Sequence, residues 1–418
     1  MAKLWTGVIK RIQFAYEGRV APVVARYIFI LYWPLYKLCK YLDVCFVVNI
    51  ESGAGHTSLE LDNFFLMRYL KEIDENKRYV WIKSNDPLIR TCMQLYHHKF
   101  TLALSSTWVY DLILPMLMRY REITIDVGLS RLKYQLREDL KFFLQKRCTH
   151  LYEISKAEWL LIQRDNYKRQ QASLGYYPLR EHRNANADEL LKFLGKKGSL
   201  LALIHIKDVL RNSIAEPLDC KTYMESLVYL QGLGYQLVLV GREKMPEAFL
   251  QFNILNYAES NIASFKNDLL LFGMANIAIV CASGVVNLAD RQNTPSLYLN
   301  FWHIGTPTCA QNSVCVPALV SKKTGQFLTF QEQHALYKSL PDIGSETFPY
   351  RDYVARNASS DEVLAGLKEV IELKDRTVSQ TALQKGMKAL DYDAPISYAM
   401  SRYSEYFLNK HRHLFQED

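Results

Sequence analysis

The second half of the chain alternates short hydrophobic runs with amphipathic segments. The strand-length runs lie at 200–206, 234–240, 255–258 and 276–282, with helical patterns at 223–230 and 265–274. Apolar runs of this length, bounded by turn residues, are typical of strands buried on both faces. Because strands that alternate with helices fit most simply into a parallel sheet covered by helices, this half predicts a Rossmann-like α/β domain.

The first half shows a similar alternation. Strands are expected at 44–50, 79–83, 102–105 and 123–127, and helices from residue 57 and at 87–97 and 110–119. Residues 131–171 are strongly charged and predict helix, as do 361–374 and 396–410 near the C-terminus. The polar stretch 178–199 separates the two alternating regions, and we place a domain boundary there.

The hydrophobic run at 276–282 ends in Ser283 and Gly284, and a helical pattern begins directly after them. A strand that passes into a helix through such a turn leaves free backbone N–H groups at the start of the helix. These groups and the helix dipole favour an anion, typically a phosphate. For these two residues alone, an ordinary turn between a strand and a helix is the simpler interpretation.

Polar and cationic residues follow the two preceding strands. They are His205 and Lys207, then Arg211 and Asn212 in the loop, and Arg242 after the next strand. Because the carboxyl ends of parallel strands meet at one edge of a sheet, we expect these side chains to gather near Ser283. Such groups suit a pyrophosphate, whereas each one alone could belong to a solvated loop.

The first half contains a second strand, glycine loop and helix. Gly53 and Gly55 precede His56, and glycine lets a backbone approach a ligand closely. A histidine there could take a proton from a hydroxyl group, since its pKa lies near neutrality. A loop histidine that caps the helix is the alternative. Glu60 and Asp62 are further candidate bases, which we interpret as surface acids that complement the helix dipole.

Length and composition indicate how many domains the chain can form and which classes of binding partner it favours. The 418 residues suffice for two or three domains, and 49% hydrophobic residues provide ample core. Of the net charge of +8, the first 40 residues carry seven cations and one acid, or +6, so a broad nucleic-acid surface is not indicated. The eight cysteines are scattered without a CxxC pair, which favours reduced thiols in a cytosolic protein.

The basic N-terminal segment also carries large apolar and aromatic residues. Its longest uncharged run, 27–36, is far shorter than the ~20 residues that span a bilayer, and the segment lacks the pattern of a signal peptide. Basic segments with Trp and Tyr often lie in the interface of anionic membranes. Residues 1–40 therefore predict either peripheral contact with an anionic membrane surface, such as the inner face of the plasma membrane, or a helix packed on the core.

Metal and nucleophile motifs are weak. Asp391 and Asp393 form a DxD, which in many nucleotide-sugar enzymes holds a divalent metal, but they do not follow a strand. The histidine pairs at 97–98 and 411–413 lack partners at metal-site spacing. No GxSxG, HExxH or P-loop pattern is present. The sequence therefore predicts no metal site.

Taken together, these residues resemble a little-characterised bacterial glycosyltransferase family of the two-Rossmann-domain (GT-B) type, related to surface polysaccharides. The matching pieces run in family order over roughly residues 50–340: Gly55-His56, His205 to Asp208, Arg211-Asn212, Tyr223, Gly234 to Gly241, Tyr257, Ser260, Ser264, Asn267-Asp268, Ser283-Gly284, Pro295, Asn300 and Leu328 to Glu332. That family usually has arginine where this chain has Lys207, as do fucosyltransferases in their HxR motif. Because lysine cannot form a bidentate fork on a phosphate, either Arg211 or Arg242 supplies it or phosphate binding is weaker.

The resemblance implies transfer of a sugar from a nucleotide-activated donor to a glycan or lipid-linked acceptor, with fixed positive groups in place of a metal or other cofactor. His56 would be the base, with Glu60 as the alternative. The residues that would bind the donor are His205, Lys207, Arg211, Asn212, Arg242, Ser264, Asp268, Ser283, Gly284, Asn287 and Glu332. The alternatives are a nucleotide-sugar epimerase on the same fold, and a non-catalytic glycan-binding or membrane-associated protein.

The fold implied is α/β, with two Rossmann-like domains facing a cleft. The expected order is a basic amphipathic helical segment (1–40), an acceptor-side domain (41–190), a nucleotide-sugar domain (191–375) and C-terminal helices (376–418). The expected location is cytoplasmic, and the expected partners do not include nucleic acid.

Overall fold

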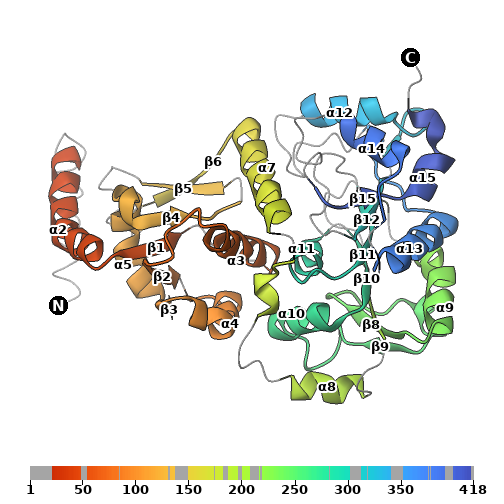
Figure 1. Ribbon diagram of the computed structural model, residues 1–418, viewed down its shortest axis with the longest axis horizontal. Coiled ribbons are helices and arrows are strands. Elements are labelled where there is room, and N and C mark those ends of the chain that lie inside the picture. The colour runs from red at the N-terminus through yellow and green to blue at the C-terminus, as the bar shows by residue number, and fades with distance from the viewer. Residues whose placement is uncertain are drawn as a thin grey trace, which may run out of the picture. The chain divides into compact units, whose positions relative to one another are not determined.

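The computed structural model of the chain forms two compact units (Figure 1). It describes residues 21–48, 54–83, 85–129, 132–136, 149–173, 175–181, 187–195, 200–207, 216, 219–281, 283–301, 312–317, 319–339, 352–374, 376, 378–390 and 399–415. The first unit comprises Met1–Ser52 and Lys71–Ile154, and the second unit comprises Gly53–Leu70 and Ser155–Asp418. The domain limits expected from the sequence divide the chain differently and remain a prediction.

The first unit is built on a parallel sheet with the order β3-β2-β1-β4. Its strands are β1 (Val44–Val48), β2 (Arg78–Lys83), β3 (Leu102–Ser105) and β4 (Thr124–Asp126), and its helices are α2 (Ala21–Tyr41), α4 (Pro87–Tyr96) and α5 (Thr107–Arg119). Asp86 starts α4 by accepting hydrogen bonds from the backbone N–H groups of Leu88 and Ile89. The alternation predicted for this half is confirmed.

Residues 131–171 differ from the predicted continuous helix. An antiparallel pair, β5 (Leu132–Leu136) and β6 (Thr149–Glu153), precedes the helix α7 (Lys156–Ala172). The sequence LKYQL in β5 alternates apolar and polar residues, which is the period of a strand. The high charge of the region concealed this short pattern, so only the second part of the prediction is correct.

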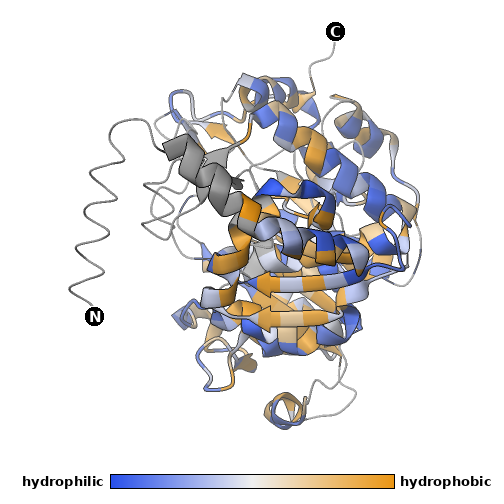
Figure 2. Ribbon diagram, turned by 90° about the vertical axis from the view of Figure 1, so that its left-hand side faces the viewer, coloured by the Kyte–Doolittle hydropathy of each residue, from blue (hydrophilic) through white to orange (hydrophobic). Residues whose placement is uncertain are grey.

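The second unit contains a seven-stranded sheet with the order β15-β12-β11-β10-β7-β8-β9, in which all neighbouring strands are parallel. The strands are β7 (Leu201–His205), β8 (Gln236–Val240), β9 (Ile254–Asn256), β10 (Ile277–Cys281), β11 (Ser296–Phe301), β12 (Val314–Pro317) and β15 (Arg402–Tyr403). Every residue of β7 and β10 is buried, as expected for strands covered on both faces. The strands that face the viewer in Figure 2, which belong to the first unit, are likewise largely hydrophobic.

Helices accompany this sheet as predicted. They include α9 (Met224–Gly232), α10 (Phe265–Met274), α11 (Gly284–Arg291) and α13 (Ser360–Lys374). The helix α3 (Ala54–Tyr69), which follows β1 in the sequence, also belongs to this unit and packs against α11. Further α-helices in the described residues are α8 (Asp188–Leu194), α12 (Phe330–Ser339), α14 (Ala382–Ala389) and α15 (Glu405–Lys410). The strand β13 (Val320–Ser321) pairs with β14 (Tyr353–Val354).

The C-terminal prediction of a helix over 396–410 is wrong in its first part. Arg402 and Tyr403 form the edge strand β15 beside β12, and the helix α15 begins only at Glu405. Ser404 caps α15 by accepting a hydrogen bond from the Phe407 backbone N–H, which fixes the start of the helix.

The order of strands locates the switch point of the sheet, where the direction of the connections reverses. From β7 the chain proceeds outward through β8 and β9, then returns to the other side of β7 and proceeds through β10, β11 and β12. This is the strand order 3-2-1-4-5-6 of a Rossmann fold, and the predicted α/β fold class is confirmed. Connections leave β7 and β10 in opposite directions, and ligands in such sheets bind at the carboxyl ends of these two strands.

Candidate functional site

The predicted convergence at the sheet edge is present in the structure. His205 is the last residue of β7, Gly241 and Arg242 follow β8, and Ser283 follows β10. The Oγ atom of Ser283 lies 3.3 Å from Nε2 of His205. A Cβ atom built on Gly241 would lie 2.9 Å from Cδ2 of the same imidazole. Three strand ends thus meet around one histidine ring.

The hydrogen bonds of His205 determine which ring nitrogen carries the proton. The backbone N–H of Cys281 donates to Nδ1 over 3.4 Å, so Nδ1 is the acceptor. The hydrogen of the neutral ring is therefore on Nε2, which donates to Ser283. Burial, together with the nearby Lys207 charge, lowers the pKa of His205 to about 4. His205 is thus uncharged at neutral pH and orients Ser283 instead of contributing a positive charge.

Ser283 caps α11 and is left with one hydrogen to donate. Its Oγ accepts the backbone N–H of Val285 over 3.2 Å and the Nε2–H of His205. These two bonds use the acceptor positions of the hydroxyl, so its own hydrogen remains for a third group. Gly284, the first residue of α11, is exposed. A hydroxyl donor beside an exposed helix start favours an anionic acceptor.

Gly241 makes room for the imidazole. Its φ of 105° lies in a region that side-chain-bearing residues rarely adopt, and an added Cβ would press on His205. Gly234, at the other end of β8, also has a positive φ, of 81°, but a Cβ there would meet nothing within 4 Å.

This difference gives a paired prediction. Gly241→Ala is expected to destabilise the protein by about 1–3 kcal/mol more than Gly234→Ala, because both carry backbone strain but only the first displaces a ring in the core. Thermal unfolding of the two variants measures the difference. Equal destabilisation by both would show that the close approach to His205 has no energetic consequence.

Two cations accompany the site. Lys207 lies two residues after His205 and is partly exposed. Its positive charge acts to lower the pKa of both His205 and Cys281. Arg242 is exposed, and its charge acts on Asp268. Burial raises the pKa of Asp268 to about 6, against the lowering influence of the Tyr257 hydroxyl and Arg242.

Several predicted donor residues already have structural partners. Tyr257 donates to Asp268 over 2.9 Å, and its oxygen accepts the Ser264 backbone N–H over 3.1 Å. Ser264 also caps α10. Glu332 forms a reciprocal cap at the start of α12, where it accepts from the Thr329 N–H over 2.7 Å and its own N–H donates to the Thr329 hydroxyl. Asn287 lies one turn into α11 and is partly exposed.

Sequence reasoning missed the buried layer beneath the site. The Tyr223 hydroxyl lies 3.2 Å from the Cys281 sulfur, and both side chains are buried. Burial raises the pKa of the Cys281 thiol to about 11, so it stays protonated and serves packing instead of nucleophilic chemistry. No local signal links the two residues, because they are 58 positions apart.

The predicted acceptor-side residues lie on α3. This helix begins at Ala54, so His56 is in its first turn and not in a preceding loop. The His56 side chain, Arg211 and Asn212 fall outside the described residues. The interpretation of Glu60 and Asp62 as surface acids is wrong, because both are buried. Asp62 forms an ion pair of 2.8 Å with Arg291 of α11.

Within the described residues, no group of three or more His, Cys, Asp or Glu side chains could hold a metal ion. The DxD at 391–393 lies outside them. His411 is occupied by a hydrogen bond of 2.7 Å to Glu362.

Comparison with known proteins adds distant structural neighbours. No family model and no curated protein matches the chain. Escherichia coli ADP-heptose heptosyltransferase II is 12% identical with a TM-score of 0.40, covering 80% of this chain and 100% of its own. The glycosyl transferase family 9 protein of Veillonella parvula is 11% identical with a TM-score of 0.38, covering 79% and 98%. E. coli heptosyltransferase WaaC with ADP is 14% identical with a TM-score of 0.35, covering 66% and 90%.

Proposed function

We propose that the protein is a glycosyltransferase that takes a sugar from a nucleotide-activated donor and transfers it to a glycan or lipid-linked acceptor. The observation that carries the proposal is the meeting of His205, Gly241 and Ser283 at the switch point of a Rossmann-like sheet. In such sheets this is where nucleotides bind. The family resemblance of the sequence, in which these same residues take part, supports the same activity.

In this proposal the diphosphate of the donor binds over the start of α11. Ser283 donates its hydroxyl hydrogen to a phosphate oxygen, and the first N–H groups of α11 face the same group. Lys207 and Arg242 offset the negative charge that grows on the diphosphate as the bond to the sugar breaks. Because this charge is met by fixed groups, the reaction needs no metal ion in this account.

His56 is the proposed base for the acceptor hydroxyl. His56 lies in the first turn of α3, which packs on α11. It therefore belongs to the same unit as the proposed donor site. Glu60 is fully buried on the same helix, and we therefore retain His56 alone in this role. His56→Ala should abolish transfer while leaving donor binding intact, since the residue acts only on the acceptor.

A thermal-shift screen against UDP-, GDP-, CMP- and ADP-sugars tests the proposal. A donor that binds only the folded state raises the unfolding temperature in proportion to ln(1 + [L]/Kd). Incubation of the donor that binds, with and without candidate acceptors, then identifies the reaction. Turnover of the donor without an acceptor would indicate an epimerase, and the absence of any nucleotide-sugar binding would favour a non-catalytic protein.

A further inference from the structure

Within the part of α2 whose side chains are described, one face of the helix packs on the first unit. Tyr36 and Cys39 are buried, and the Tyr36 ring stacks on Tyr120 with centroids 4.3 Å apart. The Tyr32 hydroxyl donates to the Leu112 carbonyl of α5 over 2.6 Å. These contacts fix which face of α2 points away from the core.

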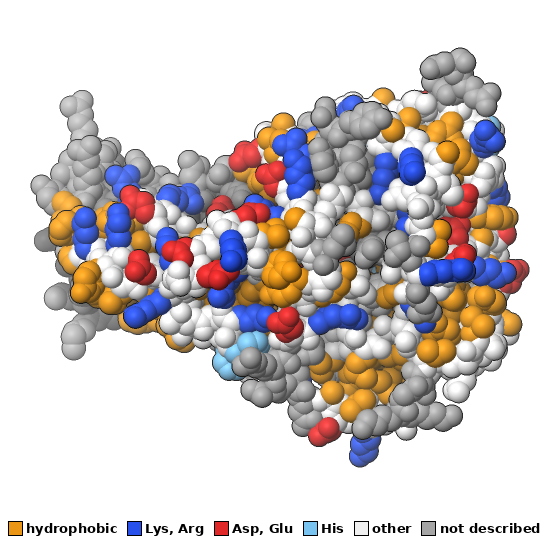
Figure 3. Space-filling model, viewed as in Figure 1, with side chains coloured by type: hydrophobic (Ala, Val, Ile, Leu, Met, Phe, Trp, Pro, Cys, Tyr) orange, Lys and Arg blue, Asp and Glu red, His pale blue; other side chains and the backbone are white. Residues whose placement is uncertain are grey.

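The outward face of α2 is also apolar. Ile30, Trp33, Leu38 and Tyr41 recur every three to five residues and are 59%, 53%, 51% and 84% exposed. On the left of Figure 3, in the region where Figure 1 draws α2, hydrophobic side chains are interspersed with Lys and Arg. A surface helix normally presents polar residues to water, so a helix that is apolar on both sides is expected to have a partner on its outer face.

The chemistry of this face fits a lipid headgroup region better than a protein. Trp and Tyr prefer the membrane interface, and lysine can lie along apolar surface while its amine reaches the headgroups. The Lys37 amine lies 5.4 Å from the centre of the Trp33 ring, so a cation sits within the aromatic patch. The first 40 residues carry seven cations against one acid, which complements an anionic surface. None of the described helices is long and apolar enough to cross a membrane.

We propose that the outward face of α2 docks the protein on an anionic lipid bilayer, with Trp33, Leu38 and Tyr41 inserted at the interface and Lys37 beside the headgroups. Exposed Leu112, whose backbone contacts α2, extends the apolar surface. This surface is separate from the proposed donor site and does not depend on it.

Sedimentation of the full chain with vesicles tests the proposal. Phosphatidylcholine vesicles with and without phosphatidylglycerol are compared. We expect the triple variant Trp33→Ser, Leu38→Ser and Tyr41→Ser to bind anionic vesicles at least about tenfold more weakly than wild type, because three apolar groups leave the interface. Lys37→Gln should weaken binding about fivefold on anionic vesicles only. The matched control, Val228→Ser with Leu250→Ser, removes exposed apolar residues of the second unit and should bind as wild type.

Thermal unfolding confirms that each variant is folded, and sedimentation velocity without lipid reports self-association. Three results would overturn the proposal: no binding to anionic vesicles, undiminished binding of the triple variant, or a wild-type dimer that the triple variant abolishes. The second would assign membrane contact to another segment, and the third would assign the face to a second copy of the chain. Donor binding by the triple variant should be unchanged in every case.

Discussion

Replacement of Asp62 by alanine is expected to destabilise the second unit by about 3–5 kcal/mol, because it leaves the guanidinium of Arg291 buried without its counter-charge. The side chains of Asp62 and Arg291 are only 5% and 3% exposed, and their ion pair measures 2.8 Å. The pair joins α3 to the end of α11, the helix whose start forms the proposed anion site. Chemical denaturation of the variant and the wild type measures the loss.

A double variant separates the pair from its burial. Burial raises the pKa of Asp62 to about 6 even though Arg291 lowers it, so desolvation outweighs the attraction. Asp62→Leu combined with Arg291→Met removes both charges, and we expect it to recover most of the stability lost in Asp62→Ala. If the double variant were as unstable as the single one, the loss would come from packing and not from an uncompensated charge.

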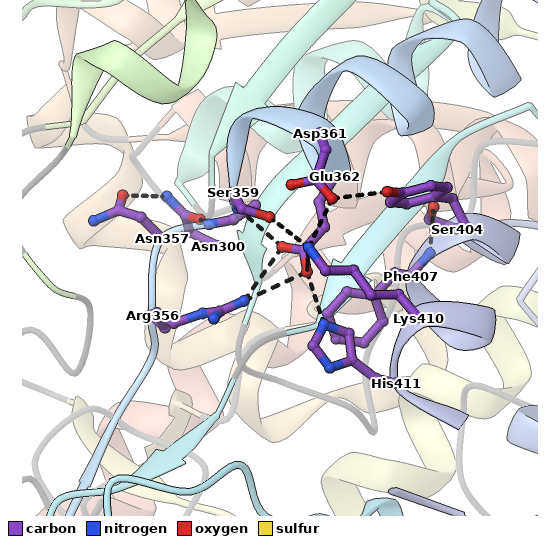
Figure 4. Close-up of polar contacts among 12 residues, drawn as sticks. Asn300, Arg356, Asn357, Ser359, Asp361, Glu362, Ser404, Phe407, Lys410 and His411 are labelled. Carbon is purple, nitrogen blue, oxygen red and sulfur yellow. Dashed lines mark hydrogen bonds and ion pairs between the residues drawn. The ribbon is translucent and has the colours of Figure 1, made fainter. Parts of the chain in front are cut away.

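Glu362→Gln is expected to lower the free energy of unfolding by about 3 kcal/mol at neutral pH. Glu362 is fully buried at the start of α13 and gathers three basic side chains (Figure 4). Its carboxylate lies 2.7 Å from His411, 3.2 Å from Lys410 and 3.3 Å from Arg356, and it accepts the Ser359 backbone N–H. The variant keeps the shape but removes the charge that these groups share.

The pH dependence of this loss has a definite sign. Burial would raise the pKa of Glu362, but hydrogen bonds from His411 and Ser359 and the charges of Arg356 and Lys410 lower it to about 2. The contribution is therefore complete above the unfolded pKa of about 4.3 and is lost as the pH falls toward 2. Denaturation of wild type and variant between neutral pH and pH 2 should show the two curves converging.

Glu372 on the same helix provides the control for Glu362. It is half exposed, and its ion-pair partner among the described residues is Arg376, one turn away, so Glu372→Gln should change stability by less than about 0.5 kcal/mol. An equal effect of both substitutions, or a Glu362→Gln loss that does not diminish in acid, would contradict the role given to the buried cluster.

The sequence predicts the central strands β7, β8 and β10 well because nearly all of their residues are buried. The uninterrupted apolar run at 276–282 is typical of a buried strand, and the pattern after Ser283 has the length and period of a helix. Among the strands that were not predicted, β5 lies in a charged region and β15 has two residues. Edge elements of this kind depend on a neighbouring strand more than on their own composition.

The sequence predicts which residues gather at the candidate site, but not their protonation states or hydrogen-bond partners. Parallel strands end at one edge, so the proximity of His205 and Ser283 follows from topology alone. The tautomer of His205 depends on the Cys281 backbone N–H, 76 residues away, and its uncharged state depends on burial. In the same way, the sequence around Asp62 predicts an acid that complements the helix dipole, whereas in the structure Asp62 pairs with Arg291, 229 residues later. Such long-range pairs leave no local pattern.

Calorimetric titration with nucleoside diphosphates tests whether the sheet edge around Ser283 holds a diphosphate. We expect at least one of UDP, GDP, CDP and ADP to bind, its nucleoside to bind far more weakly, and Lys207→Ala combined with Arg242→Ala to lower the affinity for the diphosphate by at least about tenfold. Equal affinity in the wild type and the double variant would contradict the assignment of the diphosphate to this edge.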